Sequence, residues 1–190
     1  MNQKSINIEN NPLLGNFNTP HETAPFTEIK IEHFLPAFKE AIKKGEADVK
    51  AIIENKENPA FENTIAALDR AGFLLGRTSG IFFNLLSAET NDEIQKIAQE
   101  VSPLLTKFQN DVTLNPDLFE KVKTVHNRKD ELNLTIEQQT LLENTYINFI
   151  RKGAGLSGGP PEGNHGIYKD HQRPVVRPGH RGGTLPESDH

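Results

Sequence analysis

The sequence contains no cysteine, and this absence excludes several classes of protein. Disulfide-stapled folds, zinc ribbons and thiol catalysis all require cysteine, so none of them applies, while the redox compartment stays open. Long apolar runs are missing too, because no stretch approaches the roughly 20 residues of a membrane span. The N-terminus, MNQKSINIENNPLL, has no apolar segment typical of a signal peptide. These absences predict a cytoplasmic protein with no membrane partner.

The sequence also lacks an excess of positive charge. Lysine and arginine total 21 against 26 aspartates and glutamates, and the net charge is −5. Proteins that bind nucleic acids generally present basic surfaces to the phosphates, so no nucleic-acid partner is expected. The length of 190 residues allows one domain, or one domain and a tail.

Motifs that mark a metal or nucleotide site are missing as well. The sequence has no H-E-x-x-H, no other pair of histidines four residues apart and no Walker loop. Its many acidic residues lie on predicted solvent faces, and no two of them stand out as a general acid and base. The residues alone therefore assign no catalytic, cofactor-binding or metal-binding position, and the chain by itself is not expected to be catalytic.

The longest helical pattern covers residues 58–87. Asn58 is suited to cap the first turn, and Pro59 suits the first helical position. Apolar and small residues alternate three and four apart, which predicts one buried stripe. The stripe consists of Ile65, Leu68, Gly72, Leu75, Ser79, Phe82 and Leu86.

Glycines recur every fourth residue on a second face of this helix, at positions 72, 76 and 80. Each costs about 1 kcal/mol relative to alanine in a helix interior. We therefore expect them to let another backbone approach closely. A poor helix that breaks at Gly72 or Gly76 is the alternative.

Four more helices are predicted around this one. The first spans about residues 31–55, and a third opens with the capping box Thr90-x-x-Glu93, with a kink or break expected at Pro103. Asn115 and Pro116 precede a fourth, over 117–126, with Leu118, Phe119, Val122 and Val125 buried. Thr135-x-x-Gln138 opens a fifth, which Gly153 ends, with apolar residues on or near one stripe at Ile136, Leu142, Tyr146, Phe149 and Ile150.

These patterns predict an all-α fold, an antiparallel array of about five helices, over residues 31–156. Residues 1–30 have little periodicity and should form an extended N-terminal arm. Its expected anchors are Leu13, Leu14, Phe17 and Phe26. His21 in this arm is expected to be a structural hydrogen-bonding group rather than a metal ligand.

Residues 157–190 differ in composition from the rest of the chain. They hold seven glycines and five prolines but few large apolar groups, which predicts a disordered tail. Four histidines lie here, His165, His171, His180 and His190. A metal-binding tail is the alternative, although these spacings match no compact ligand motif.

Seven short segments, read in order, carry a resemblance to a known family. They are Asn11–Phe26, Ile29–Phe38, Asn58–Ile65, Asn84–Asp92, Leu114–Val122, Leu134–Leu142 and Phe149–Ser157. Together they resemble the N-terminal region of bacterial zinc metallopeptidases of the thimet oligopeptidase family. The peptidyl-dipeptidase branch is the most similar, and oligopeptidase A comes next.

The resemblance implies a helical, two-lobed enzyme whose N-terminal helices restrict access to a channel. In that family a zinc ion and the glutamate of H-E-x-x-H activate water, and peptidyl-dipeptidases release C-terminal dipeptides from short peptides. This chain lacks the catalytic region, so the resemblance transfers no catalytic or zinc-binding residue to it and no bound zinc is expected. Its partners would be short peptides and the missing catalytic lobe, both belonging to the parent enzyme.

The change of composition at residue 157 suggests a frameshift, with a natural truncation as the competing explanation. The expected function is that of a truncated N-terminal lobe, inactive alone. A non-enzymatic helical interaction module is the alternative function.

Overall fold

The computed structural model describes residues 10–88 and 91–154. By its backbone contacts the chain divides into two units, Met1–Ser157 and Gly158–His190, and the described residues all belong to the first. Among them there are helices, turns and irregular segments but no strand, so the all-α prediction is confirmed. The predicted tail and its four histidines lie outside the described residues.

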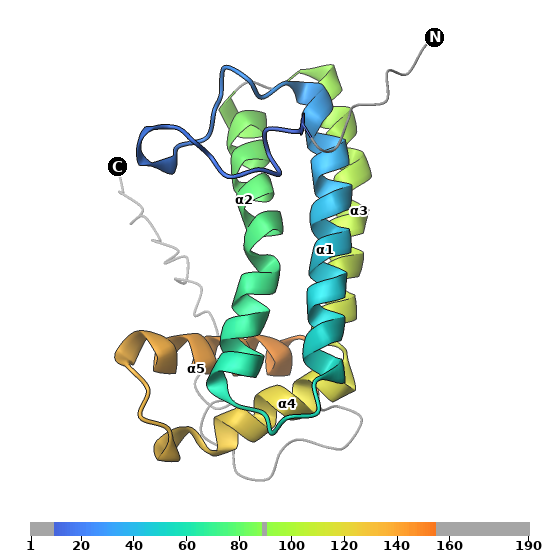
Figure 1. Ribbon diagram of the computed structural model, residues 1–190. Coiled ribbons are helices and arrows are strands. Elements are labelled where there is room, and N and C mark those ends of the chain that lie inside the picture. The colour runs from blue at the N-terminus through green and yellow to red at the C-terminus, as the bar shows by residue number, and fades with distance from the viewer. Residues whose placement is uncertain (1–9, 89–90, 155–190) are drawn as a thin grey trace, which may run out of the picture. The chain divides into compact units, whose positions relative to one another are not determined.

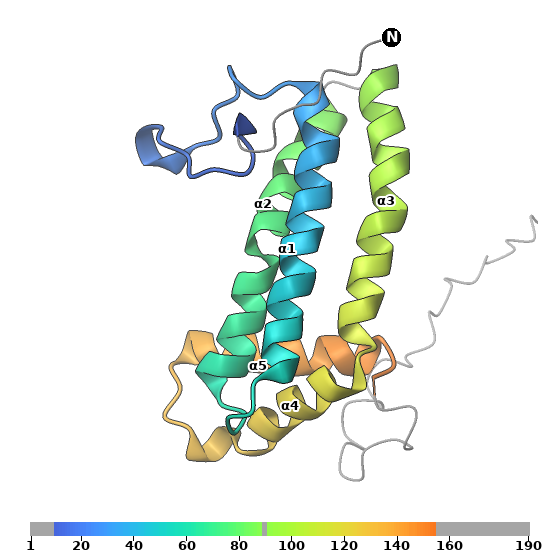
Figure 2. The same cartoon turned by 45° about the vertical axis from the view of Figure 1, so that its right-hand side comes forward.

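Three long helices run up and down beside one another (Figures 1 and 2). They are α1 (Phe34–Glu54), α2 (Ala67–Ala88) and α3 (Asp92–Thr113). Helix α1 packs against both α2 and α3. Two shorter helices, α4 (Pro116–Asn127) and α5 (Ile136–Arg151), lie across one end of this row (Figure 1). The antiparallel arrangement is thus carried by the first three helices, and the last two cross them.

Helices α4 and α5 begin at the caps that the sequence indicates, and α4 extends one residue beyond the predicted 117–126 at each end. The Asn115 side chain accepts a hydrogen bond from the backbone N–H of Leu118, and Thr135 and Gln138 form the reciprocal capping box. Gly153 adopts a left-handed conformation with φ 96°, and the N–H groups of Gly153 and Ala154 close the last turn of α5. All four predicted apolar residues of α4 are buried. In α5, however, Ile136 is 79% exposed, because it lies in the first turn, which no other described element covers.

The beginning of α2 differs from the prediction. Residues 58–60 are irregular, and a π-helical segment (Phe61–Ala66) precedes α2. Asn63, not Asn58, satisfies the free backbone groups: its side chain accepts from the N–H of Ala60 at 2.8 Å and donates to the carbonyl of Asn58 at 3.0 Å. Helix α2 then continues without a break through all three glycines, so the alternative of a broken helix is wrong.

Helix α3 also begins one residue later than expected. Asn91 is its cap, and the Asn91 side chain accepts hydrogen bonds from the N–H groups of Glu93 and Ile94, each at 3.0 Å. Thr90, the predicted cap, lies outside the described residues. The helix continues through Pro103, so the predicted break does not occur there.

The helices bury two apolar clusters. One joins α4, α5 and the π-helical segment to the lower ends of α1 and α2, with Phe119, Tyr146 and Phe149 at its centre. The other lies between the N-terminal arm, α1, α2 and α3, where Phe82 packs 5.1 Å from the Phe34 ring and 5.4 Å from the Phe38 ring. These clusters fix the relative positions of the helices that form the candidate site. Within residues 10–88 and 91–154, no helix combines the length and the apolar character that a membrane span requires.

Candidate functional site: a groove between α2 and α3

A groove of about 630 Å³ lies between α2 and α3. Its apolar lining comes from Leu68 and Leu75 of α2 and from Leu105, Phe108 and Val112 of α3. Val49 of α1 forms part of the floor, and residues of α5 close one end. The groove therefore has walls from two helices and a base from a third.

Polar side chains contribute to the rim of this groove. They are Asp69 of α2, Gln109 of α3, and Asn144 and Asn148 of α5. All four residues are exposed, and none of their side chains has a hydrogen bond or ion pair with another described residue. One carboxylate and three neutral amides are thus available to a molecule that enters the groove.

Gly72 and Gly76 form part of the α2 wall. A β-carbon built at either position, or at Gly80, would meet no atom within 4 Å. The prediction that these glycines permit a close backbone approach is therefore wrong within the described residues. Because glycine has no side chain beyond a hydrogen atom, these positions leave open space on the α2 side of the groove.

The close approach occurs at Gly45, which the sequence analysis did not single out. A β-carbon at Gly45 of α1 would lie 2.8 Å from Cζ of Phe108 and 3.4 Å from the carbonyl oxygen of Ala71. Glycine at this position lets α3 and α2 both pack against α1. No local pattern marks it, because the partner residues lie far along the sequence.

Arg77 of α2 holds the N-terminal arm. Its Nη2 donates hydrogen bonds to the carbonyl oxygens of Leu13 (2.7 Å) and Gly15 (2.8 Å), and its guanidinium lies 4.3 Å from the centroid of the Phe17 ring. Burial lowers the pKa of Arg77, and its buried Nε has no hydrogen-bond partner among the residues that the structure describes. Leu13 is fully buried, so the expected docking of the arm at Leu13 is confirmed.

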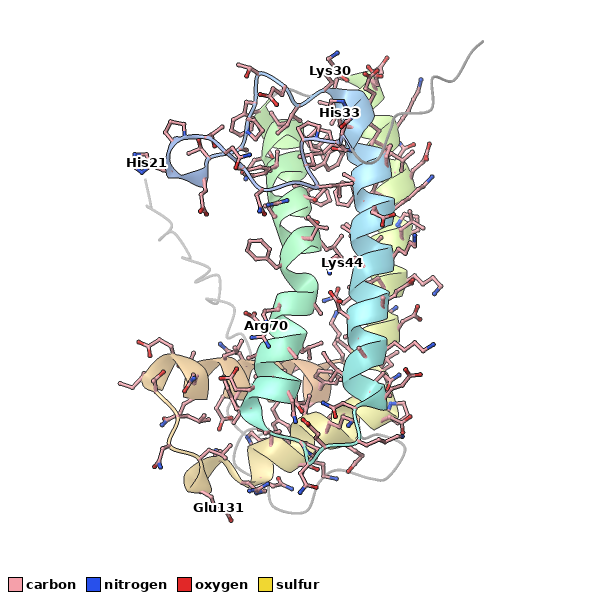
Figure 3. The ribbon with its side chains drawn as sticks, in the orientation of Figure 1. His21, Lys30, His33, Lys44, Arg70 and Glu131 are labelled. Carbon is pink, nitrogen blue, oxygen red and sulfur yellow. The ribbon has the colours of Figure 1, made fainter. Side chains whose placement is uncertain are left out.

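Two other expectations for the arm are not met. Phe26 is 60% exposed, so it does not dock on the helices. His21 lies at the tip of the arm and points away from the helices (Figure 3), and among the described residues its side chain has no hydrogen-bond partner. Close to the arm, a structural role belongs instead to His33, whose Nδ1 accepts from the backbone N–H of Lys30 at 3.1 Å.

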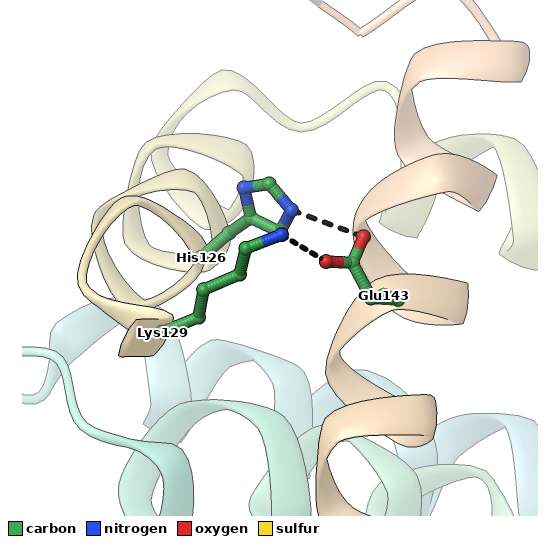
Figure 4. A network of polar contacts seen from close by, with 3 residues as sticks. All are labelled: His126, Lys129 and Glu143. Carbon is green, nitrogen blue, oxygen red and sulfur yellow. Dashed lines mark hydrogen bonds and ion pairs between the residues drawn. The ribbon is translucent and has the colours of Figure 1, made fainter. Parts of the chain in front are cut away.

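A polar network joins the end of α4 to α5 (Figure 4). Glu143 accepts from Lys129 on one carboxylate oxygen, and its other oxygen lies 3.2 Å from Nε2 of His126. The His126 ring stacks on Tyr146 with centroids 3.8 Å apart. Burial alone would raise the pKa of Glu143, but the hydrogen bonds and charges of Lys129 and His126 outweigh burial and lower it. The hydrogen bond to Glu143 raises the pKa of Lys129.

This network does not fit the zinc ion that the family resemblance implies. Zinc sites in proteins use three or four His, Cys, Asp or Glu ligands. Within the part of the chain that the structure describes, no three such residues come together. At the nearest pair, His126 and Glu143, the ammonium of Lys129 already binds the carboxylate. We therefore derive no catalytic step through zinc for these residues.

Residues 153–159, Gly-Ala-Gly-Leu-Ser-Gly-Gly, satisfy two short patterns, G-x-G-x-x-G and G-x-S-x-G. Both patterns carry a function only where a strand precedes the glycines and a helix follows. Here the preceding element is α5, and Gly153 ends it with a left-handed turn. The context is that of a helix C-terminus, so neither pattern indicates a nucleotide site or a nucleophile.

Comparison with known proteins gives three informative similarities. The chain is 37% identical over 147 residues to a dipeptidyl carboxypeptidase of Escherichia coli, a match that covers 77% of this chain and 22% of the relative. It is 27% identical over 146 residues to an oligopeptidase A of Salmonella typhimurium, covering 77% of this chain and 21% of the relative. A protein of Arabidopsis thaliana described as a probable cytosolic oligopeptidase A is 23% identical over 149 residues, or 78% of this chain and 20% of the relative.

These matches cover only part of each relative, so the activity of the whole relative does not carry over to this chain from the comparison alone. The chain spans about a fifth of the length of the curated relatives that it matches. No family model matches the chain.

Proposed function

We propose that the matched part of the chain, which is homologous to the N-terminal region of the dipeptidyl carboxypeptidase and oligopeptidase A family, forms the N-terminal helical part of such a peptidase. The parent activity would be zinc-dependent hydrolysis of short peptides with release of C-terminal dipeptides. The observation that carries this proposal is the 37% identity over 147 residues to a dipeptidyl carboxypeptidase.

In this proposal the chain contributes structure and no catalytic or metal-binding residue. The proposal divides the chain into an N-terminal segment of residues 1–30, whose described part is the arm that Arg77 binds, a helical lobe over residues 31–156 and a C-terminal segment of residues 157–190. The described polar contacts support a structural role. Arg77 of α2 binds the N-terminal arm, and Glu143 connects α4 to α5. The catalytic groups belong to the remaining four fifths of a family chain.

The cell compartment and partners follow from the same proposal. We place the protein in the cytoplasm, in keeping with the relative described as a probable cytosolic oligopeptidase A. The net charge of −5 favours peptides over nucleic acids as the molecules that the whole peptidase binds.

A direct test measures dipeptide release from a short peptide by the purified 190-residue chain, with zinc added and with a chelator. The E. coli dipeptidyl carboxypeptidase is the positive control under the same conditions. The proposal predicts no release by the chain alone. Chelator-sensitive release would contradict it, because this chain would then contain a complete metal site.

A non-enzymatic interaction module is the second candidate, and exposed apolar side chains favour it. Phe73 of α2 is 67% exposed, close to Arg77, and Ile136 of α5 is also exposed. Such groups count as evidence for an interface where they form one contiguous apolar patch on the surface. Light scattering separates the two candidates in part: a module that acts by self-association forms a defined oligomer, whereas an isolated lobe remains monomeric at low concentration.

A further inference from the structure

The long helices occupy three sides of a four-helix arrangement. Helix α1 packs against both α2 and α3, and the groove lies where α2 and α3 face each other across α1. In a four-helix bundle, the helix opposite α1 would occupy this position, because each helix packs against two neighbours. The groove thus has the geometry of a helix-binding site whose fourth helix is supplied by another segment.

The surface of the groove fits a helix in detail. Its floor and walls are apolar, through Val49, Leu75 and Leu105, and Gly72 and Gly76 lower the wall on the α2 side. Within the described residues nothing packs on these two glycines, so their cost to α2 brings no benefit to the fold of this unit. A second helix that rested on them would gain close backbone contact.

The length of the relatives indicates where such a helix comes from. The chain covers 22% of the E. coli dipeptidyl carboxypeptidase, so most of a family chain has no counterpart in it. If the unit is a portion of a peptidase lobe, that remaining part is long enough to supply a segment that packs on it. This step rests on the proposed function.

We propose that the groove between α2 and α3 binds an amphipathic helix from the part of a family peptidase that this chain lacks. The apolar side of that helix lies on Leu68, Leu105 and Phe108, which line the groove and are only partly buried. Its flanks carry donors and acceptors for the free amides of Asn144 and Asn148, and a lysine or arginine for Asp69, which has no ion pair with another described residue. The groove is then the surface through which this lobe joins the rest of the enzyme.

The glycines provide a test that separates docking from folding. In a chimera, residues 11–157 of this chain replace the matching segment of the E. coli dipeptidyl carboxypeptidase. The variant Gly72→Leu/Gly76→Leu fills the groove wall, and Gly80→Leu is the matched control. Gly80 lies on the same helix with the same open space around its β-carbon, but it does not line the groove. All variants are also made in the free 190-residue chain.

In the free chain, neither set of substitutions should lower the melting temperature measured by circular dichroism, because leucine favours helix over glycine. In the chimera, Gly72→Leu/Gly76→Leu should lower kcat/KM for dipeptide release about tenfold or more by overpacking the joint, whereas Gly80→Leu should leave it unchanged.

Each outcome has a distinct meaning. Equal kcat/KM for the parent chimera and both variants would overturn the docking proposal and leave the proposed function standing. An equal loss with Gly80→Leu would overturn it too, because the effect would not depend on the groove. A parent chimera that folds but releases no dipeptide would contradict the proposed function itself, and the docking proposal with it.

Discussion

Gly45 of α1 faces the ring of Phe108 so closely that a β-carbon at Gly45 would lie 2.8 Å from the ring atom Cζ. This contact brings α3 against α1 and places Phe108 on the wall of the groove. The position of one glycine therefore determines how far α3 stands from α1, and with it the width of the candidate site.

A matched pair of substitutions tests this relationship. Gly76→Ala should stabilise the chain by about 1 kcal/mol, because alanine favours the helix and its β-carbon meets nothing. Gly45→Ala should instead destabilise it by about 1 kcal/mol, since overpacking against Phe108 exceeds the gain in helix propensity. Urea unfolding followed by circular dichroism measures both. An equal stabilisation by the two substitutions would show that α1 and α3 are not in tight contact at Gly45.

The arm should depend on the guanidinium of Arg77 rather than on its charge. Arg77→Lys keeps a cation but loses the planar group that binds two carbonyls and stacks on Phe17, so we expect a loss of about 1–2 kcal/mol in the free energy of unfolding. Arg70→Lys on the same helix is the control. Arg70 is exposed, its ion pair with Glu62 is 4.0 Å long and its hydrogen bond to the Glu62 carbonyl is 3.4 Å long, so its replacement should change the stability by less than about 0.5 kcal/mol.

Limited proteolysis checks the same prediction independently. The arm of the Arg77→Lys variant should be cut faster than that of the wild type, while the Arg70→Lys variant should behave as the wild type. Similar cleavage rates in all three proteins would mean that Arg77 does not hold the arm.

The network around Glu143 should make stability depend on pH at the acid end. Its pKa is lowered in the folded state, so the ionised carboxylate stabilises the fold above the ordinary value of 4.5. This contribution is lost as the pH falls below that value and through the lowered pKa. Glu143→Gln should therefore destabilise the chain at neutral pH, by less than about 1 kcal/mol because solvent screens the partly exposed carboxylate, and progressively less as the pH falls below 4.5.

The contribution of Lys129 to stability depends on pH in the opposite direction and is lost at the alkaline end. Its pKa is raised above the ordinary value of 10.5, so its contribution is complete below that value and is lost as the pH rises through the raised pKa. Urea unfolding across the pH range measures both effects. A constant difference between the wild type and Glu143→Gln from pH 7 to pH 3 would show that the carboxylate is not paired in the folded chain.

Local sequence patterns predicted much of the helical structure. The apolar spacing of Leu118, Phe119, Val122 and Val125, the capping box at Thr135 and the stop at Gly153 all appear as expected. Each of these features depends on residues within a few positions of one another, so the information is present in a short window.

Features that depend on distant residues were not predictable in this way. Arg77 reaches carbonyls more than 60 residues earlier in the chain, and the partner of Gly45 is on another helix. A glycine shows that a β-carbon is absent but not what lies opposite, which is why the glycines of α2 were assigned the close approach that belongs to Gly45. Periodicity likewise could not show that Ile136 remains uncovered.

The most direct test of the central claim is the activity of the parent chimera, before any glycine is changed. The claim is that this chain is a structural part of a peptidase and supplies none of its catalytic groups. It predicts that the E. coli dipeptidyl carboxypeptidase carrying residues 11–157 in place of its own segment releases dipeptides, and that a chelator stops the release. A chimera that folds, as judged by circular dichroism, yet releases no dipeptide would contradict the claim.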